Sequence, residues 1–326
     1  MKAAVVKAVG PASNIVTGDV PVPVLQAGQV LVRFIASEVN HVDLFVRSGA
    51  YRTPLPTPFA IGRDLVGQVE QSEDSAFAPG DLVWTNSLGY AGRNGTYSQF
   101  VCVDANRLYP LPEGVEPRDA AVVLHGGLTA YLGWFREGGL TRGQTVVIGG
   151  GSGAVGSAAI QMASHAGARV IATASARNHG YCRELGADTV VDYHDENWVH
   201  QVRAAASEGV DIWWQTASAL DASKALELMN HGGKLLLTAG MQDALQVPVG
   251  GLYTRDCSIR GFAASNASVS DLRAAAEHIN AGLAAHELRG RVALSLPLDR
   301  AREAHEALES GSVRDGRILM TSFQEG

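Results

Sequence analysis

Cysteine is scarce in this chain of 326 residues: Cys102, Cys182 and Cys257 are isolated and odd in number. They provide neither a disulfide framework nor a C-x-x-C pair. Charged residues make up only 18% of the sequence, the net charge is -7, and Lys and Arg form no long run. This composition argues against nucleic acid as a partner and suits a reducing cytoplasm.

Long apolar runs are also missing. Residues 143–168 contain no Asp, Glu, Lys or Arg, but this stretch is rich in glycine. A membrane-spanning helix needs about 20 consecutive, predominantly apolar residues. The first residues, MKAAVVKAVGPASN, contain Lys2 and Lys7 and no apolar run of signal-peptide length. We therefore expect no membrane association and a cytoplasmic location.

What the chain does contain is typical of a globular α/β protein, with 46% hydrophobic residues, 37 glycines and 12 prolines. Its length favours two domains. The first part has short alternating or β-branched runs at 29–36, 65–71 and 80–86, which predict an antiparallel, β-rich domain. Three prolines within 51–59 make that segment an extended loop.

From about Glu116 the pattern changes to alternating helices and buried strands, which predicts a doubly wound parallel sheet. The expected strands are Thr145–Gly149, Ala168–Thr173, Thr189–Asp192, Asp211–Gln215, Lys234–Thr238 and Ser258–Phe262. The expected helices between them are Ala154–Ala166, Ala176–Leu185, Trp198–Ser207 and Ser223–Asn230.

The last part of the chain returns to β-structure. It predicts a helix with Ser270 as N-cap and Asp271 in its first turn, a helix over 300–309 and a strand over 316–321. We expect this tail to rejoin the first domain. The predicted division is a discontinuous catalytic domain, 1–118 and 266–326, around a dinucleotide-binding domain, 119–265.

A glycine-rich motif is the strongest local signal. Gly151, Gly153 and Gly156 satisfy G-x-G-x-x-G directly after an apolar strand and before an Ala-rich helix. Glycines let the backbone approach a pyrophosphate, which then lies at the helix N-terminus. The motif therefore predicts a nicotinamide dinucleotide site, with a purely structural turn as the alternative.

The segment after the second predicted strand favours NADPH over NADH. An NAD site normally has Asp or Glu about 20 residues beyond the glycines, where it binds the ribose 2′-hydroxyl. Here no acidic residue lies between Ser157 and Arg183. Ser175 and Arg177 instead offer a hydroxyl and a guanidinium suited to a 2′-phosphate. The alternative for Arg177 is a solvated residue at a helix start.

With these features together, the chain resembles the medium-chain dehydrogenase/reductase superfamily, and within it the zeta-crystallin-like NADPH:quinone oxidoreductases. The resemblance covers nearly the whole length. It is carried by VNHVDLFVRSGAY (39–51), FAIGRDLVGQV (59–69), APGDLVW (78–84), GTYSQFVCV (95–103), AAVVLHGGLTAYLGW (120–134) and LGADTVVDY (185–193). It implies a GroES-like β-rich catalytic domain plus a Rossmann domain, and a homodimer paired through the edge around 257–262.

The resemblance also implies that the protein uses no metal. Zinc-dependent relatives have Cys where this chain has Asn40, and Gly-His-Glu where it has Gly62-Arg63-Asp64, and their Cys-rich structural zinc loop is absent. Neither Asn40 nor Arg63 supplies the thiolate or imidazole of a tetrahedral zinc site. The third ligand position falls on His125. Two interpretations of His125 stay open: a proton donor or substrate-orienting imidazole, and a packed residue without a chemical role.

Site residues follow by the same resemblance. Asn40 and Thr129 would flank the nicotinamide, and Tyr51 would face the active site, with a loop anchor as the alternative for Tyr51. Asp43 would orient the Asn40 loop rather than act as an acid. The cofactor would contact the glycine motif, the adenosine-phosphate turn and two further positions: Gly151, Ser152, Gly153, Ala154, Val155, Gly156, Ser175, Arg177, Tyr193, Gly240 and Phe262.

The function implied is NADPH-dependent hydride transfer to a quinone or an α,β-unsaturated carbonyl compound. The product anion would take a proton from His125, Tyr51 or water. One alternative is an enoyl reductase acting on acyl thioesters. Another is a non-catalytic NADPH-binding or structural protein. Arg63 and Asp64 depart from the usual family pattern. The sequence therefore predicts the chemical class of the substrate and not the individual compound.

Overall fold

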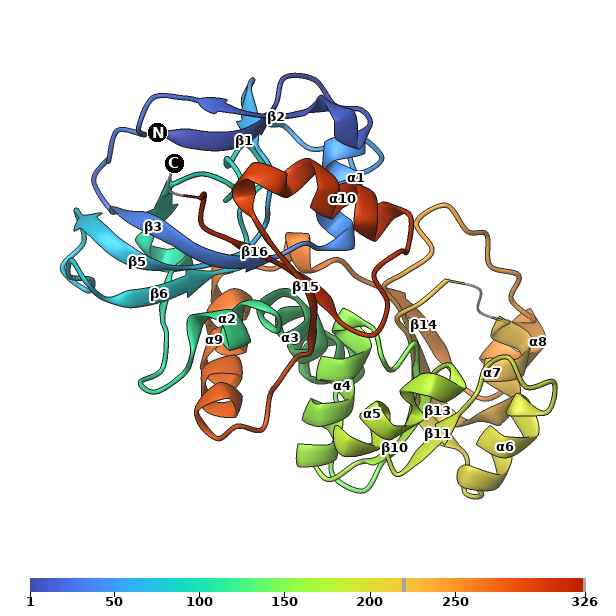
Figure 1. Ribbon diagram of the computed structural model, residues 1–326. Helices are drawn as coiled ribbons and strands as arrows, with labels where there is room; N and C mark the ends of the chain where they lie inside the picture. Colours follow the sequence, from blue (N-terminus) through green and yellow to red (C-terminus); the bar gives the residue numbers. More distant parts are fainter. Residues whose placement is uncertain (219–220, 325–326) are drawn as a thin grey trace. The chain divides into compact units, whose positions relative to one another are not determined.

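The computed structural model describes residues 1–218 and 221–324 (Figure 1). Two compact units are present, one formed by Met1–His125 with Ser268–Gly326 and the other by Gly126–Ala267. The chain passes between them twice: within helix α3 (Leu124–Tyr131), and again after Ala267. The first unit has two sheets and the second has one, and each unit has its own core.

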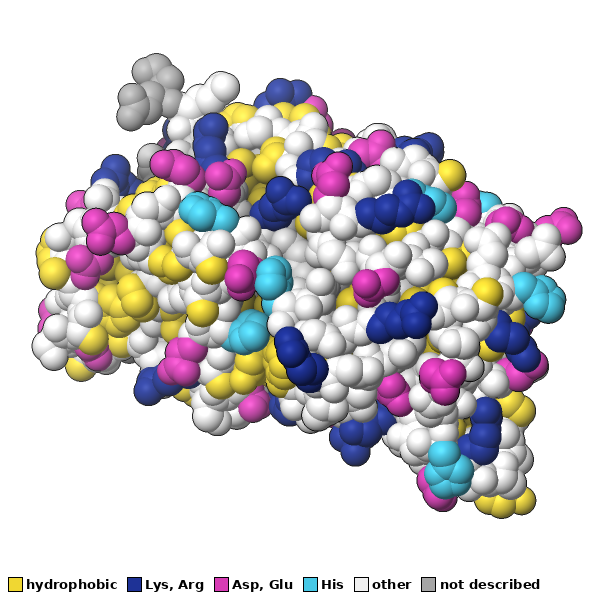
Figure 2. All heavy atoms as spheres, turned by 90° about the horizontal axis from the view of Figure 1, so that it is seen from below, with side chains coloured by type: hydrophobic (Ala, Val, Ile, Leu, Met, Phe, Trp, Pro, Cys, Tyr) yellow, Lys and Arg dark blue, Asp and Glu magenta, His cyan; other side chains and the backbone are white. Residues whose placement is uncertain are grey.

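The surface of the described residues carries both signs of charge. Figure 2 shows Lys and Arg side chains interspersed with Asp and Glu on the face it displays, without a broad region of either sign there. None of the helices in the described part of the chain combines the length and apolar character that crossing a bilayer requires.

The first unit is built mainly of strands. Before the junction it contains β1 (Lys2–Val6), β2 (Ile15–Asp19), β3 (Gln29–Glu38), α1 (His41–Ser48), β4 (Phe59–Ala60), β5 (Leu65–Ser72), β6 (Leu82–Thr85), β7 (Phe100–Asp104), β8 (Tyr109–Pro110) and α2 (Pro117–Ala121). After the second unit it continues with α9 (Val269–Ala284), β15 (Val292–Pro297), α10 (Ala301–Glu309) and β16 (Arg317–Thr321).

Strand β3 organises the larger sheet of this unit. It pairs antiparallel with β5, β7 and β16, so the last strand of the chain lies beside one of the first. The prediction of β-structure over 29–36, 65–71 and 80–86 is confirmed. The expected all-antiparallel arrangement is wrong at one edge, where β15 runs parallel to β16 because α10 provides the crossover between them.

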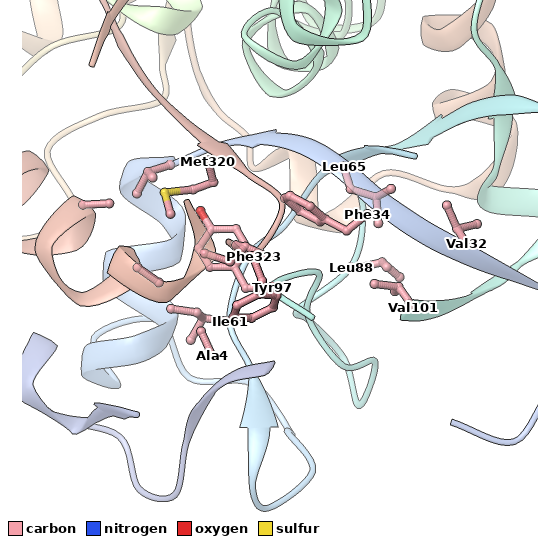
Figure 3. Packing of buried hydrophobic residues seen from close by; sticks show 14 of the residues in the cluster. Ala4, Val32, Phe34, Ile61, Leu65, Leu88, Tyr97, Val101, Met320 and Phe323 are labelled. Carbon is pink, nitrogen blue, oxygen red and sulfur yellow. The ribbon is translucent and has the colours of Figure 1, made fainter. Parts of the chain in front are cut away.

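A continuous hydrophobic core fills the first unit (Figure 3). Phe34 and Tyr97 meet edge to face with ring centroids 6.5 Å apart. Met320 and Phe323 enter the same cluster from the C-terminal segment. The core therefore joins the two sequence segments of this unit by apolar burial as well as by strand pairing.

The second unit alternates strands and helices. In order after α3 it contains a π-helical stretch (Leu132–Gly138), β9 (Thr145–Gly149), α4 (Ala154–His165), β10 (Arg169–Thr173), α5 (His179–Glu184), β11 (Thr189–Val191), α6 (Trp198–Ala205), β12 (Val210–Gln215), α7 (Ala222–Leu228), β13 (Met229–Leu237), α8 (Val249–Tyr253) and β14 (Ser258–Gly261).

All six strands of this unit are parallel, in the order β11-β10-β9-β12-β13-β14. This is the strand order of a Rossmann sheet, whose ligands bind beyond the carboxyl ends of the strands where the order reverses. The reversal lies between β9 and β12. Side chains of β9, β10, β12 and β13 pack with α6 and α7 in one core. The predicted doubly wound fold is confirmed.

Several predicted boundaries are wrong, among them the following three. Helix α9 is capped by Ser268, not Ser270: the Ser268 hydroxyl accepts from the Asp271 amide at 3.1 Å, and the Asp271 carboxylate accepts from the Ser268 amide. Asn230 belongs to β13 and not to α7, which ends before the Gly232-Gly233 pair with Gly232 at φ 75°. Strand β14 ends at Gly261, before Phe262.

The corrected cap gives a direct test of the helix start. Ser268→Ala is expected to lower the free energy of unfolding by about 1 kcal/mol, because the Asp271 amide loses its acceptor. Ser270→Ala is the matched control and should change it by only a few tenths of a kcal/mol. Chemical denaturation of both variants measures this difference. A larger loss for Ser270→Ala would place the cap where the sequence alone suggested it.

Candidate functional site

Asn40 lies at the turn between β3 and α1. It has extended backbone angles and acts as the N-cap of α1. The backbone N–H of Asn40 donates to the Asp43 carboxylate at 2.8 Å. The helix ends at Gly49, whose φ of 83° lies in the left-handed region. Tyr51 lies two residues beyond Gly49. The short helix thus fixes Asn40 at one end and Tyr51 at the other, and the expected hydrogen bond from Asp43 to the Asn40 loop is present.

The Asp64 carboxylate holds the Asn40 turn from a different segment. Its Oδ1 accepts from the Ser37 hydroxyl at 2.8 Å and from the Glu38 amide at 3.2 Å. Its Oδ2 accepts from the Asn40 side-chain nitrogen at 3.0 Å. Asp64 is fully buried. The carboxamide of Asn40 therefore has a fixed orientation, with its nitrogen directed at Asp64.

Several charges are buried in the same region of the first unit. Glu38 pairs with Arg317, whose Nε lies 3.3 Å from Glu38 Oε1, and the Tyr97 hydroxyl donates to the Glu38 carbonyl. Burial raises the pKa of Asp43 to about 7 and the pKa of Asp64 to about 6. Burial also raises the pKa of Glu38, although Arg317 opposes this. These shifts show that burying the charged carboxylates is unfavourable, and perturbed pKa values of this kind are typical of functional sites.

Arg63 brings a guanidinium into this cluster. It is only 2% exposed, and its Nη1 donates to the Leu88 carbonyl at 3.4 Å. Burial lowers the pKa of Arg63, and the carboxylates of Asp43 and Asp64 oppose that shift. The guanidinium also lies over the ring of Tyr90, 5.3 Å from its centroid.

Tyr51 contacts the same aromatic ring. The rings of Tyr51 and Tyr90 are 5.3 Å apart at their centroids, and their hydroxyls are 3.5 Å apart. Tyr90 was not identified from the sequence. Tyr90 lies in a loop rich in glycine and polar residues, which shows no hydrophobic periodicity. Its aromatic side chain is the one sequence feature that suggests a role.

His125 lies on α3 and is partly buried. Burial lowers the pKa of His125 to about 3, and the nearby Arg63 and His41 lower it further. The imidazole is therefore neutral at pH 7. Thr129 is one helical turn further along α3 and is 5% exposed.

The donor set at the former zinc positions is a carboxamide, a guanidinium and an imidazole. Among the described residues, no three His, Cys, Asp or Glu side chains are grouped as metal ligands would be. A fixed guanidinium at Arg63 also opposes a dication by charge. Independence from metal remains a prediction, argued from these donors.

In the second unit, the glycine motif forms a tight turn between β9 and α4. Gly150 has a φ of 81°. A Cβ on Gly156 would lie 2.2 Å from the Gly150 oxygen, and one on Gly151 would lie 2.9 Å from the Ala172 side chain. The Gly151 amide donates to the Thr173 carbonyl at 2.9 Å. The glycines are thus required by close backbone packing, and the backbone of Ser152–Val155 leads into the N-terminus of α4.

Helix α3 packs against this loop within the second unit. A Cβ on Gly126 would lie 2.5 Å from the Ala154 carbonyl oxygen. Thr129 follows Gly126 by one turn of α3. The structure therefore brings the helix that carries Thr129 next to the glycine motif.

The turn after β10 contains Ser175 and Arg177, and Arg177 is exposed. The Asn178 side-chain nitrogen donates to the Ser175 hydroxyl at 3.4 Å. Asp192 accepts from the Ala176 and His194 amides at 3.1 and 2.9 Å, and these bonds lower the pKa of Asp192. Asp192 thus holds the Ser175 turn beside Tyr193, whose side chain is half exposed.

Gly240 lies at a cavity of about 540 Å³ beyond the ends of β12 and β13. Its lining includes Gln215, Ala217 and Leu237. The place fits the region where a Rossmann sheet binds its ligand. Phe262 follows β14, and the centroid of its ring lies 5.8 Å from the ring centroid of the buried Trp214.

Comparison with known proteins agrees with this arrangement. Residues 26–113 match the alcohol dehydrogenase GroES-like domain, and residues 154–281 match the zinc-binding dehydrogenase family. The quinone oxidoreductase of Mus musculus is 29% identical over 95% of this chain and 94% of its own. A crystal structure described as an NAD-dependent alcohol dehydrogenase is 30% identical, with a TM-score of 0.88 over 98% of this chain and 99% of its own.

The chain belongs to the zeta-crystallin-like quinone oxidoreductase family of the medium-chain dehydrogenases/reductases. It is an oxidoreductase with a GroES-like domain and a Rossmann domain, it binds a nicotinamide cofactor, and it acts on a small molecule. A mycobacterial member, whose structure holds NADPH, is 27% identical with a TM-score of 0.84 over 98% of this chain and all of its own.

The shifted pKa of His125 has a measurable effect on stability. The folded imidazole titrates at about 3, whereas an unfolded one titrates near 6.5, so the unfolded chain binds more protons between these values. Stability should therefore fall as the pH falls through this window. From about pH 7.5 to about pH 5, wild type should lose about 2 kcal/mol more than His125→Gln. Equal losses, measured by denaturant titration, would contradict a neutral, buried His125.

Proposed function

We propose that the protein reduces a quinone or an α,β-unsaturated carbonyl compound with NADPH and without a metal. The observation that carries the proposal is the buried cluster around Asn40. In this cluster the Asn40 side chain donates to Asp64. Buried Arg63 has a guanidinium where zinc-dependent relatives have an imidazole. The similarity to quinone oxidoreductases over 95% of the chain supports the substrate class.

The second unit fits a dinucleotide. The turn formed by Gly151, Ser152, Gly153, Ala154, Val155 and Gly156 would contact the pyrophosphate at the N-terminus of α4, because its glycines let the backbone approach closely. Ser175, Arg177 and Tyr193 would surround the 2′-phosphate, and Asp192 holds the turn that carries Ser175 through its bonds from the Ala176 and His194 amides. Gly240 and Phe262 would complete the cofactor site. When bound, NADPH supplies the hydride.

Side chains of the first unit would orient the substrate and supply a proton. Asn40 of this unit and Thr129 of the second unit would flank the nicotinamide. Hydride addition leaves a negative charge on the substrate oxygen, which requires one proton. We assign its delivery to the Tyr51 hydroxyl, which lies 3.5 Å from the Tyr90 hydroxyl. The neutral imidazole of His125 would orient the substrate by hydrogen bonding rather than serve as the acid.

We further propose that residues 1–118 and 266–326 form the catalytic domain and residues 119–265 the NADP-binding domain. The two compact units support this division, with junctions a few residues away. A cytoplasmic homodimer, paired through the edge strand β14, completes the proposal; β14 has a neighbour only on its β13 side among the described strands.

The test is NADPH oxidation with a neutral naphthoquinone, a neutral enone and an enoyl thioester. Turnover of the quinone or enone is expected. Turnover of the thioester alone would favour an enoyl reductase, and NADPH binding without any turnover would favour a binding protein.

Cofactor preference depends on Arg177. Arg177→Asp should weaken NADPH binding by roughly 10- to 100-fold, because a charged hydrogen bond to phosphate is lost, and should change NADH binding much less. Arg169→Asp is the matched control, since it makes the same charge change at the opposite end of β10. Calorimetry with both nucleotides measures the difference. Equal losses for NADPH and NADH would reject the assignment.

Independence from metal has its own test. Dialysis against a chelator should leave kcat/KM for quinone reduction unchanged, because none of the proposed roles uses an ion. Adding zinc should not increase it. Activity that is lost on dialysis and restored by zinc, together with turnover of primary alcohols, would contradict the proposal.

A further inference from the structure

Three guanidinium groups from separate segments converge on the loop that follows β6. Arg93 Nε donates to the Ser87 carbonyl at 3.0 Å, and Arg107 Nη1 donates to the Ser87 hydroxyl at 3.3 Å. Arg63 Nη1 reaches the carbonyl of the next residue, Leu88, at 3.4 Å. Ser87 and Leu88 are buried, so these contacts fix where the guanidinium groups lie.

Arg63, Arg93 and Arg107 form an arginine cluster, in which the charges of Arg93 and Arg107 are incompletely balanced. Among the described residues, neither Arg93 nor Arg107 forms an ion pair with a carboxylate. Asp104 is close enough to raise the pKa of Arg93, but burial, Arg107 and Arg63 together lower it. One Asp104 oxygen already accepts from Gln29 at 3.0 Å. Like charges held together in this way favour a bound anion.

The cluster lies beside the proposed proton donor. Tyr90 belongs to the same loop, contacts Tyr51 through ring and hydroxyl, and lies against Arg63. Arg93 and Arg107 are partly exposed, whereas Arg63 is buried. A substrate at Tyr51 would therefore lie next to Tyr90, which contacts Arg63, and the charges of Arg63, Arg107 and Tyr90 all act on Arg93.

We infer that Arg93 and Arg107, supported by Arg63 beneath Tyr90, bind a carboxylate carried by the substrate. The physiological substrate is then an acidic quinone or enone rather than a neutral one. This inference rests on the proposed function and narrows its substrate class. Planar guanidinium groups suit a carboxylate because they donate paired hydrogen bonds to it.

The experiment compares a benzylidene acetone bearing a para-carboxylate with the methyl ester of the same compound. The two differ in charge and have the same reacting enone. Wild type should show kcat/KM for the acid roughly tenfold above that for the ester, chiefly through KM, because a charged hydrogen bond is worth about this factor. The preference should shrink with added salt.

Variants assign the preference to the cluster. Arg93→Gln and Arg107→Gln should each lower the acid-to-ester ratio several-fold, and Arg93→Lys should retain part of it because the charge remains. Arg314→Gln is the matched control: Arg314 is exposed, lies in the same unit and bonds only a carbonyl of its own turn, so the ratio should stay as in wild type.

The possible outcomes distinguish failure of the carboxylate site from failure of the proposed function. Equal turnover of acid and ester by wild type, or a ratio that the Arg93 and Arg107 variants leave unchanged, overturns the carboxylate site while the proposed function stands. If neither acid, ester nor a neutral naphthoquinone is reduced with NADPH, the proposed function fails and this inference fails with it. A purely structural role of the arginines would lower thermal stability and both rates together, leaving the ratio constant.

Discussion

The Asp64 carboxylate is the interaction on which the first unit's chemistry depends. It accepts from Ser37, from the Glu38 amide and from the Asn40 side chain, and it lies next to Arg63. Strand β3, the start of α1 and the segment before β5 are thereby joined at one buried point. Because an unsatisfied buried carboxylate is costly, each partner is held in place by the others.

We propose that this network lets a fold shared with zinc-dependent relatives work with different side chains. Where a metal would polarise a substrate, this chain has a fixed carboxamide, a buried guanidinium and a neutral imidazole. A preorganised guanidinium or imidazole can stabilise developing negative charge without coordination chemistry. The cost is visible in the raised pKa values of Asp43 and Asp64, and the surrounding hydrophobic core offsets it.

Much of this architecture follows from sequence patterns. Alternation predicts β3 and β5, and the glycine spacing predicts the turn between β9 and α4, because both depend on local backbone requirements. The start of α9 was misplaced because two serines compete for one cap, and only the contact with Asp271 distinguishes them. The sequence does not predict a role for Tyr90, Arg93 or Arg107, because the tertiary fold brings these residues together. The roles of Asn40, Tyr51, His125 and Thr129 came from resemblance, and they remain predictions.

A crystal structure of the protein with NADPH, grown with zinc present, tests the central claim most directly. The account predicts NADPH bound with its 2′-phosphate at Arg177 and its nicotinamide beside Asn40 and Thr129, and no metal between Asn40, Arg63 and His125. A metal ion coordinated at those three positions, or a nicotinamide bound away from Asn40, would contradict it.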